Sequence, residues 1–266
     1  MEVQSKGGQK TTSELLYMIL SAAIGGALTS MHIEFVEIQN FRRLESIRID
    51  FTPKTTLFVG ANNSGKTSVI EALRCFLDKQ SRFTTNEFTL SNWTRINKIG
   101  ADWEALEISP GPTSDSLADW ETELPSLDLW LQVGRDQIHY VNKLLPTLDW
   151  EEGLLGIRLR LEPKNIEDLH KEYLSATHRA KETLKAEPNQ AGSETKQVAL
   201  WPRTMREFLD RRLGIFLTVR AYSLDPTKHV LPAEGIARPQ TLPVGSEPID
   251  GDPLKELIRI DVIYAQ

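Results

Sequence analysis

The stretch LFVGANNSGKTSVIEALRCFL, residues 57 to 77, matches the phosphate-binding pattern G-x-x-x-x-G-K-[ST] without a mismatch, from Gly60 to Thr67. A short β-rich run, TTLFVG at 55 to 60, leads into the loop. After the loop, apolar residues recur at helical spacing through Val69, Ile70, Leu73 and Phe76, which predicts a helix that packs on a sheet. Strand, loop and helix therefore follow one another in the order that the motif requires.

The residue types in this loop suit a bound nucleotide. Successive backbone N–H groups can surround a phosphate, and the start of the following helix adds its positive end. Gly60 and Gly65 permit a tight turn, Lys66 supplies a charge for the β and γ phosphates, and Thr67 supplies a hydroxyl ligand to Mg²⁺. We therefore predict that the chain binds ATP with Mg²⁺. The predicted nucleotide-binding residues are Gly60, Ala61, Asn62, Asn63, Ser64, Gly65, Lys66 and Thr67.

Composition excludes several classes of protein. The 266-residue chain carries 31 basic and 37 acidic residues, a formal net charge of −6, so contact with DNA would need a local basic patch. The single cysteine, Cys75, rules out an internal disulfide and a cysteine-based zinc site. These features fit a reducing cytoplasm, and we expect a cytoplasmic protein.

The first thirty residues differ from the rest. The uncharged run at 15 to 28 is too short to span a bilayer comfortably and suits the apolar region of a signal peptide, yet a nucleotide-binding loop is useful only where ATP is plentiful. Met31 directly precedes a clear strand pattern. We expect Met31 to be the natural start, residues 1–30 to be an upstream extension or non-native start, and no association with a membrane.

Periodicity along the chain predicts a mixed α/β fold. Alternating patterns predict strands at 32–41, 46–51, 127–133, 156–162 and 215–222, and an apolar strand within the closing LKELIRIDVIYAQ. Helical spacing predicts a helical segment over 165–214, made of a helix at 165–186, with Asn165 as its N-cap, and another near 203–213. Residues 79–126 are expected to be an irregular insertion, and 225–253 a loop. Because the chain stops within an apolar run, we expect a fragment.

Two stretches together resemble a known family. MHIEFVEIQNFRRLESIRIDF followed by LFVGANNSGKTSVIEALRCFL is similar to the amino-terminal lobe of ABC-type ATPases of the SMC and RecF kind. The match is nearest to the OLD (overcoming-lysogenization-defect) and Gabija-A endonuclease group, whose pattern I-x-N-F-R corresponds to Ile38, Asn40, Phe41 and Arg42. The resemblance is specific over residues 31–78 and general over 127–162.

This resemblance implies a P-loop NTPase of the ABC type whose ATPase heads dimerise, or form a higher oligomer, around ATP. It also implies a carboxy-terminal TOPRIM domain that cuts DNA with divalent metal, and Arg42 as a contact to the nucleotide. No LSGG-like signature, Walker B acid or TOPRIM acidic cluster occurs in these residues, so the chain is expected to hold an incomplete ATPase lobe and no nuclease domain. The whole protein would be an ATP-dependent DNA endonuclease, with a role in phage defence, and this chain alone would not cut DNA.

Two other functions remain open. A RecF- or SMC-like ATPase would clamp DNA for repair without cutting it, and a truncated remnant would bind only nucleotide or a partner. For Arg42, the alternative is a solvated arginine beside Arg43. Asp261 is not assigned as a metal ligand, because a carboxylate on the exposed face of a half-buried strand explains it better.

Other residues carry weaker signals. The cluster Arg203, Arg206, Arg211 and Arg212 could contact DNA phosphates, but interspersed acidic residues favour a solvated helix face. Cys75 is expected to be packed rather than reactive, and His170 and His178 to be surface residues. Trp93, Trp103 and Trp120 either pin the insertion to the sheet or mark a partner surface.

Overall fold

A computed structural model describes residues 16–22, 31–53, 56, 65–78, 80–108, 116–147, 149–186, 200–230, 236–255 and 257–264. Residues 60–64 of the phosphate loop lie outside the described residues, as does the strand expected at 55–60, apart from Thr56.

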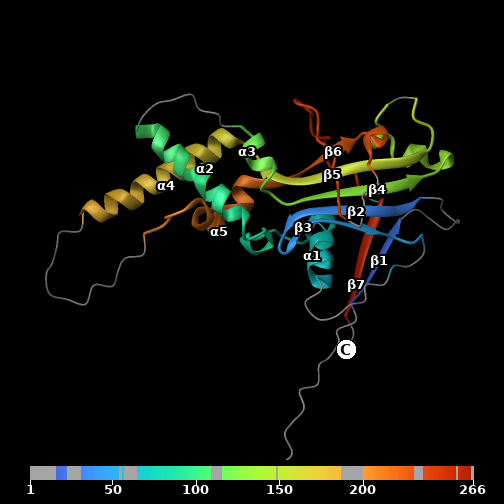
Figure 1. The fold of residues 1–266 in the computed structure, drawn as a ribbon, viewed down its shortest axis with the longest axis horizontal. Coiled ribbons are helices and arrows are strands. Elements are labelled where there is room, and N and C mark those ends of the chain that lie inside the picture. The colour runs from blue at the N-terminus through green and yellow to red at the C-terminus, as the bar shows by residue number, and fades with distance from the viewer. Residues whose placement is uncertain are drawn as a thin grey trace, which may run out of the picture.

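Five strands form one antiparallel sheet in the order β3-β2-β4-β5-β6 (Figure 1). They are β2 (His32–Phe41), β3 (Leu44–Asp50), β4 (Ser126–Val133), β5 (Gly153–Pro163) and β6 (Leu217–Leu224). Each was predicted from the sequence; β2 has the expected bounds, and the bounds of the other four differ from the expected ones by one to three residues. The mixed α/β prediction is confirmed.

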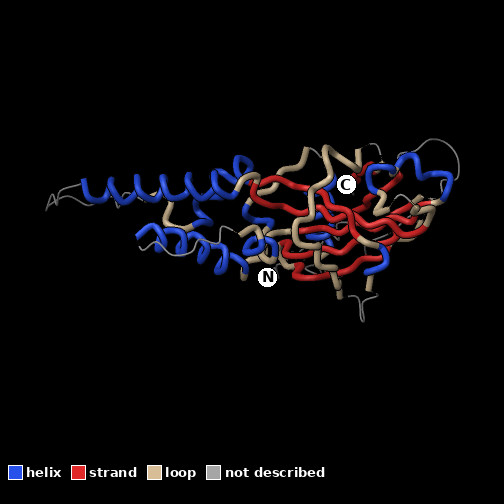
Figure 2. Tube along the Cα trace, turned by 90° about the horizontal axis from the view of Figure 1, so that it is seen from above, coloured by secondary structure: helices blue, strands red, loops and turns tan. Residues whose placement is uncertain are grey.

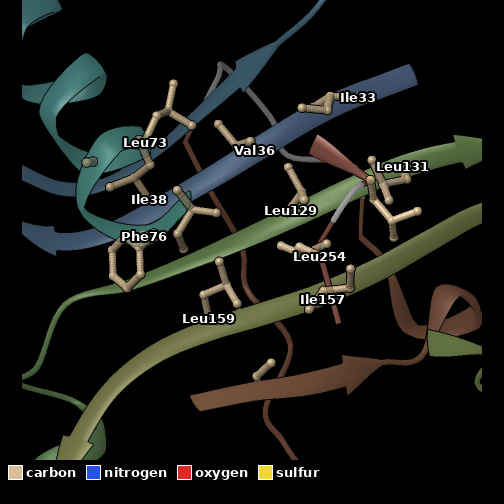
Figure 3. Packing of buried hydrophobic residues seen from close by; sticks show 14 of the residues in the cluster. Ile33, Val36, Ile38, Leu73, Phe76, Leu129, Leu131, Ile157, Leu159 and Leu254 are labelled. Carbon is tan, nitrogen blue, oxygen red and sulfur yellow. The ribbon is translucent and has the colours of Figure 1, made fainter. Parts of the chain in front are cut away.

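Helix α1 (Lys66–Leu77) covers the apolar face of this sheet. Its residues Leu73 and Phe76 are buried against apolar side chains from β2, β4 and β5, among them Ile38, Leu129 and Leu159 (Figure 3). Alternate strand residues point to this face because side chains alternate along a strand. The helix predicted after Lys66 is confirmed, and its apolar stripe is the part that meets the sheet.

The opposite face of the sheet is charged. Arg158 on β5 donates from Nε and Nη2 to the two carboxylate oxygens of Asp128 on β4, both at 2.7 Å, and both side chains are buried. The segment after β6 crosses this face: the Arg238 N–H donates to Glu37 at 3.2 Å, and His229 lies against Phe35 and 3.1 Å from Arg48 Nη1. The buried charges of Arg158 and Asp128 are thus paired, as buried charged groups usually are.

A helical lobe extends from one end of the sheet (Figures 1 and 2). Its main helices are α2 (Asn92–Ile108), α4 (Ile166–Ala186) and α5 (Met205–Phe216). They enclose a second apolar core that contains Tyr173 and Phe208. The helices predicted at 165–186 and near 203–213 are confirmed, and Asn165 caps α4 by accepting the Asp168 N–H at 3.1 Å.

The expectation that residues 79–126 are irregular is wrong. This segment forms η1 (Thr85–Glu87), the 17-residue helix α2 and the short helix α3 (Ala118–Glu121). The inward positions of α2 include Trp93, Ile96, Gly100 and Trp103, which lie at helical spacing but are diluted by polar neighbours. A glycine is needed at position 100, because a Cβ there would lie 2.9 Å from the hydroxyl oxygen of Tyr173.

The three tryptophans in question are buried in this lobe. Trp93, Trp103 and Trp120 are each at most 3% exposed and belong to the second core. They therefore join residues 79–126 to the second apolar core, and none of them lies at the surface.

The remaining elements are short or lie outside the five-stranded sheet. They are η2 (Arg135–Tyr140), η3 (Asn142–Leu144), η4 (Pro226–Lys228), β1 (Leu16–Ala22) and β7 (Ile258–Tyr264). β1 and β7 form a two-stranded antiparallel ribbon with Leu16 opposite Tyr264. The closing strand is thus confirmed over 258–264, while the assignment of residues 1–30 to an extension stays a prediction. None of the described helices is long and apolar enough to cross a bilayer.

Candidate nucleotide-binding site

The described part of the phosphate loop begins at Gly65, which is the N-cap of α1. Its φ of +89° lies in the left-handed region, where a residue with a Cβ is strained. A Cβ built on Gly65 would lie 3.4 Å from Cδ2 of Leu44, so the β2–β3 hairpin approaches the loop closely at this point. The glycine therefore serves both the turn and the start of the helix.

The amino-terminal end of α1 has the character of an anion site. The first helical hydrogen bond runs from the Val69 N–H to the Gly65 carbonyl at 3.0 Å, so the N–H groups of Lys66, Thr67 and Ser68 belong to the first turn, ahead of the repeating helical bonds. No acidic residue occupies the first turn. Both features favour an anion at this end of the helix.

The side chains at this end fit a magnesium nucleotide. Lys66 is half-buried and Thr67 is exposed, so a compact charge and a hydroxyl stand together at the helix start. These are the groups that a triphosphate and its Mg²⁺ ion require from this motif. Lys66 and Thr67, with the N–H groups above, would hold the phosphates and the metal ion. The roles assigned to residues 60–64 fall outside the described residues.

The β2–β3 hairpin has an unusual backbone beside this site. Asn40 and Arg42 have φ values of 54° and 53°, in the left-handed region that few residues other than glycine adopt. Tertiary hydrogen bonds hold both. The Arg42 N–H donates to the Glu87 carbonyl at 2.8 Å, and Asn40 Nδ2 donates to the Thr122 carbonyl at 2.8 Å. The hairpin is therefore fixed by the segment between α1 and β4.

The guanidinium of Arg42 is held by carboxylates. Its Nη2 donates to Glu87 Oε1 at 3.1 Å and lies 4.0 Å from Oε2 of Glu71 on α1. Glu71 also accepts from Arg74 Nη1 at 3.0 Å. The Arg42 side chain is 29% exposed, so it is an anchored group next to α1 and not a freely solvated one. Its contact with a nucleotide stays a prediction.

Cys75, also on α1, takes no part in a reactive site. The thiol is buried, and burial raises its pKa to about 11, partly offset by the Ser81 hydroxyl, which donates to Sγ at 3.8 Å. A thiol with such a pKa holds little thiolate near neutral pH. The expectation that Cys75 is packed is confirmed.

The arginine cluster on and before α5 covers aromatic rings. Arg206 lies over Trp93 at 5.3 Å, and Arg211 and Arg212 lie over Trp201 at 4.9 and 5.2 Å. Arg203 donates to Glu207 at 3.1 Å. These contacts explain the arginines as parts of the lobe surface, and Arg203, Arg206 and Arg211 are exposed.

The remaining candidates do not converge on the loop. His178 is exposed as expected, whereas His170 is half-buried and stacks on Trp103 at 4.5 Å. The side chain of Asp261 lies outside what the structure describes. Among the described residues, no group of three or more His, Cys, Asp or Glu side chains is placed to hold a metal ion.

Sequence reasoning missed Glu87 and Glu71 as parts of this site. Neither lies in the phosphate-binding pattern, and Glu87 is 45 residues from Arg42. The spacing T-x-x-E at Thr84–Glu87 was a usable local signal, because it is a capping-box pattern, and the structure forms that box. The pairing with Arg42 had no local signal.

Comparison with known proteins extends this picture. Residues 31–200 match the family model described as AAA ATPase domain. The chain is 36% identical over 63 residues to the DNA replication and repair protein RecF of Lysinibacillus sphaericus, covering 24% of this chain and 17% of that protein. It is 34% identical over 83 residues to RecF of Listeria welshimeri, covering 31% and 22%. The chain thus spans about a fifth of the length of these relatives.

A similar solved structure comes from work on ATP-driven dimerization and DNA-stimulated activation of SMC ATPases. It is 15% identical, has a TM-score of 0.28, and the match covers 50% of this chain and 65% of that one. The family match, by contrast, extends over more than half of the chain and includes the phosphate loop, α1 and the sheet strands β2 to β5. The protein belongs to the AAA ATPase domain family, with the mixed α/β architecture of a P-loop NTPase.

Proposed function

We propose that this chain binds Mg·ATP through residues 60–67 and is the ATPase part of an ATP-dependent DNA endonuclease of the OLD type. The observation that carries the nucleotide site is the start of α1. There a left-handed Gly65, the N–H groups of the first helical turn, Lys66 and Thr67 lie together, with no acid in the first turn. ATP supplies the phosphate charge that these groups would neutralise.

Different residues of the chain would have different roles in binding the nucleotide. Lys66 would balance charge on the β and γ phosphates, and Thr67 would contribute its hydroxyl to the metal ion. α1 would hold both groups in place, because its apolar face, including Ile70 and Leu73, is anchored on the sheet. Arg42, anchored by Glu87, would reach the nucleotide from the side of the hairpin.

Cutting of DNA, dimerisation around ATP and a role in phage defence rest on the sequence resemblance. DNA and a second copy of the chain would then be its partners, in the cytoplasm. The RecF-type alternative, an ATPase that acts on DNA without cutting it, is favoured by one specific observation: the matched relatives carry the name DNA replication and repair protein RecF.

Nucleotide binding is tested by Lys66→Ala. We expect Mg·ATP to bind about 10- to 100-fold more weakly, the equivalent of one lost charge-assisted contact, with the thermal midpoint unchanged. Isothermal titration calorimetry measures the affinity. Lys98→Ala is the matched control, because Lys98 is an exposed lysine on α2 paired with Asp102 and lies outside the loop. Equal affinity of the Lys66→Ala variant and the unaltered protein would reject the site.

The nuclease is tested separately on the whole protein of which this chain would be the ATPase part, because this chain alone is not expected to cut DNA. The assay uses supercoiled plasmid, Mg²⁺ or Mn²⁺, and ATP. Nicking or linearisation by the protein supports the OLD-type endonuclease. DNA binding that depends on ATP, with the plasmid intact, supports the RecF-type alternative. Binding of ATP with no effect on DNA would leave the nucleotide-binding remnant as the remaining function.

A further inference from the structure

We infer that Glu87 is a positioning residue that holds Arg42 in place beside the nucleotide site. This inference rests on the proposed nucleotide site and goes beyond it, because Glu87 lies outside the phosphate-binding pattern. Three observations carry it: the contacts of Arg42, the burial of Glu87, and the attachment of Glu87 to the helical lobe.

Arg42 is fixed by Glu87 at two points. Its backbone N–H donates to the Glu87 carbonyl at 2.8 Å, and its Nη2 donates to the Glu87 carboxylate at 3.1 Å. The backbone contact stabilises the left-handed φ of 53°, a conformation that costs an L-residue free energy. One residue thus contacts both the backbone of the hairpin and the guanidinium.

The hairpin so fixed lies against the start of α1. Leu44 touches the Cβ position of Gly65, and Arg42 lies 4.0 Å from Glu71, one turn after Thr67. Within the described part of the chain, both carboxylate contacts of Arg42 use Nη2. The side chain is 29% exposed, and a guanidinium carries five N–H donors, so Arg42 can also contact an anionic ligand while it pairs with Glu87.

Glu87 is itself rigidly held. Its side chain is 9% exposed, and Oε2 accepts from the Thr84 N–H at 2.7 Å and from the Thr84 hydroxyl at 2.6 Å. The neighbouring Thr85 hydroxyl donates to Asp210 of α5, which joins η1 to the helical lobe. A carboxylate fixed in this way can orient a guanidinium with little loss of side-chain entropy on ligand binding.

The sign of one substitution distinguishes positioning from simple electrostatics. Glu87→Gln removes a negative charge near a phosphate site, so charge alone predicts tighter ATP binding. Loss of positioning predicts the reverse. Glutamine still suits the capping box, so the change acts mainly on the pair with Arg42. We expect Glu87→Gln to weaken Mg·ATP binding by about three- to tenfold, a fraction of one charge-assisted contact.

The matched control is Glu123→Gln. Glu123 is another buried carboxylate of this lobe that pairs with an arginine, Arg95 at 2.8 Å, and it makes no contact with Arg42. We expect this variant to bind ATP like the unaltered protein. Thermal unfolding of both variants shows whether any loss of binding merely follows a loss of fold.

A double-mutant cycle in the full chain tests the dependence on Arg42. Arg42→Ala should weaken binding, and Glu87→Gln should have no further effect in that background. Tighter binding by Glu87→Gln, an equal loss in both backgrounds, or no effect of Arg42→Ala would each overturn the inference. If Glu87→Gln does not fold, Glu87→Asp can replace it, because aspartate keeps the charge but moves the carboxylate away from Arg42. Unchanged affinity of the Glu87→Asp variant for Mg·ATP would then count against the positioning role.

The inference and the proposed function fail in different ways. If Lys66→Ala binds Mg·ATP normally, the nucleotide site itself is wrong. If Lys66→Ala loses binding while the cycle between Arg42 and Glu87 shows no coupling, the site stands and only the positioning role is rejected.

Discussion

The same substitution at two helical glycines should change stability in opposite directions. Gly100 lies in α2 and Gly214 in α5. A Cβ at Gly100 would lie 2.9, 3.0 and 3.1 Å from Oη, Cζ and Cε1 of Tyr173, whereas a Cβ at Gly214 meets nothing within 4 Å. Alanine is favoured over glycine within a helix by about 1 kcal/mol, and near the end of α5 the gain is smaller.

Tyr173 has little freedom to yield. It is 1% exposed, and its hydroxyl donates to Glu104 Oε1 at 2.9 Å. Overpacking of this kind costs about 1–3 kcal/mol. We therefore expect Gly214→Ala to raise the free energy of unfolding by up to about 1 kcal/mol, and Gly100→Ala to lower it by up to about 2 kcal/mol after the helical gain is subtracted.

Urea denaturation at fixed pH measures both variants, and an unchanged m-value shows that the unfolded states are comparable. Because the helical preference enters both changes, the difference between the two variants reports the contact with Tyr173. Equal changes in the free energy of unfolding would refute the packing of α2 against α4. Gly100→Ala should also cost less in a Tyr173→Phe background, where the nearest atom is removed.

Two further predictions concern the charged face of the sheet. Asp128→Ala should lower the free energy of unfolding by about 3–5 kcal/mol, because it leaves Arg158 buried without its carboxylate. Lys98→Ala, which breaks the exposed pair of Lys98 with Asp102, should lower it by less than about 1 kcal/mol. Similar losses for the two variants in urea denaturation would contradict the burial of the Asp128–Arg158 pair. Burial, with the nearby Arg48 charge, lowers the pKa of His229 below 6.5, so the unfolded chain binds more protons than the folded one just below that pH. Stability should therefore fall as the pH drops through and below about 6.5, and a His229→Gln variant whose pH profile follows that of the unaltered protein would exclude this cause.

Local periodicity predicted most of the fold. The strands β2, β4 and β5 follow alternating patterns within single short stretches, and the stripe from Val69 to Leu77 marks the buried face of α1. Each of these patterns is contained in the element that it predicts. Pattern reasoning therefore succeeds where one face of an element is apolar and the other is polar.

Pattern reasoning failed for α2, where the buried residues include large aromatics that are separated by polar residues and a glycine. Trp93 and Trp103 are at helical spacing, but Gly100 between them reads as a helix breaker. The reason for the glycine is the ring of Tyr173, which belongs to α4 and is 73 residues away. A residue selected by a distant neighbour leaves no pattern in its own segment.

The two halves of the candidate site differ in the same way. The phosphate-loop half is encoded by eight consecutive residues, because backbone N–H groups and a helix start can be assembled only from contiguous chain. The half around Arg42 is assembled from the hairpin, α1 and η1, which meet only after folding. The pair formed by Arg42, in its left-handed conformation, and the buried Glu87 has no characteristic sequence spacing. It could therefore be found only from the structure. Because different segments build the two halves, loss of Lys66 and loss of Glu87 should weaken nucleotide binding through independent contacts, and a Lys66→Ala background should leave the pairing of Arg42 with Glu87 intact.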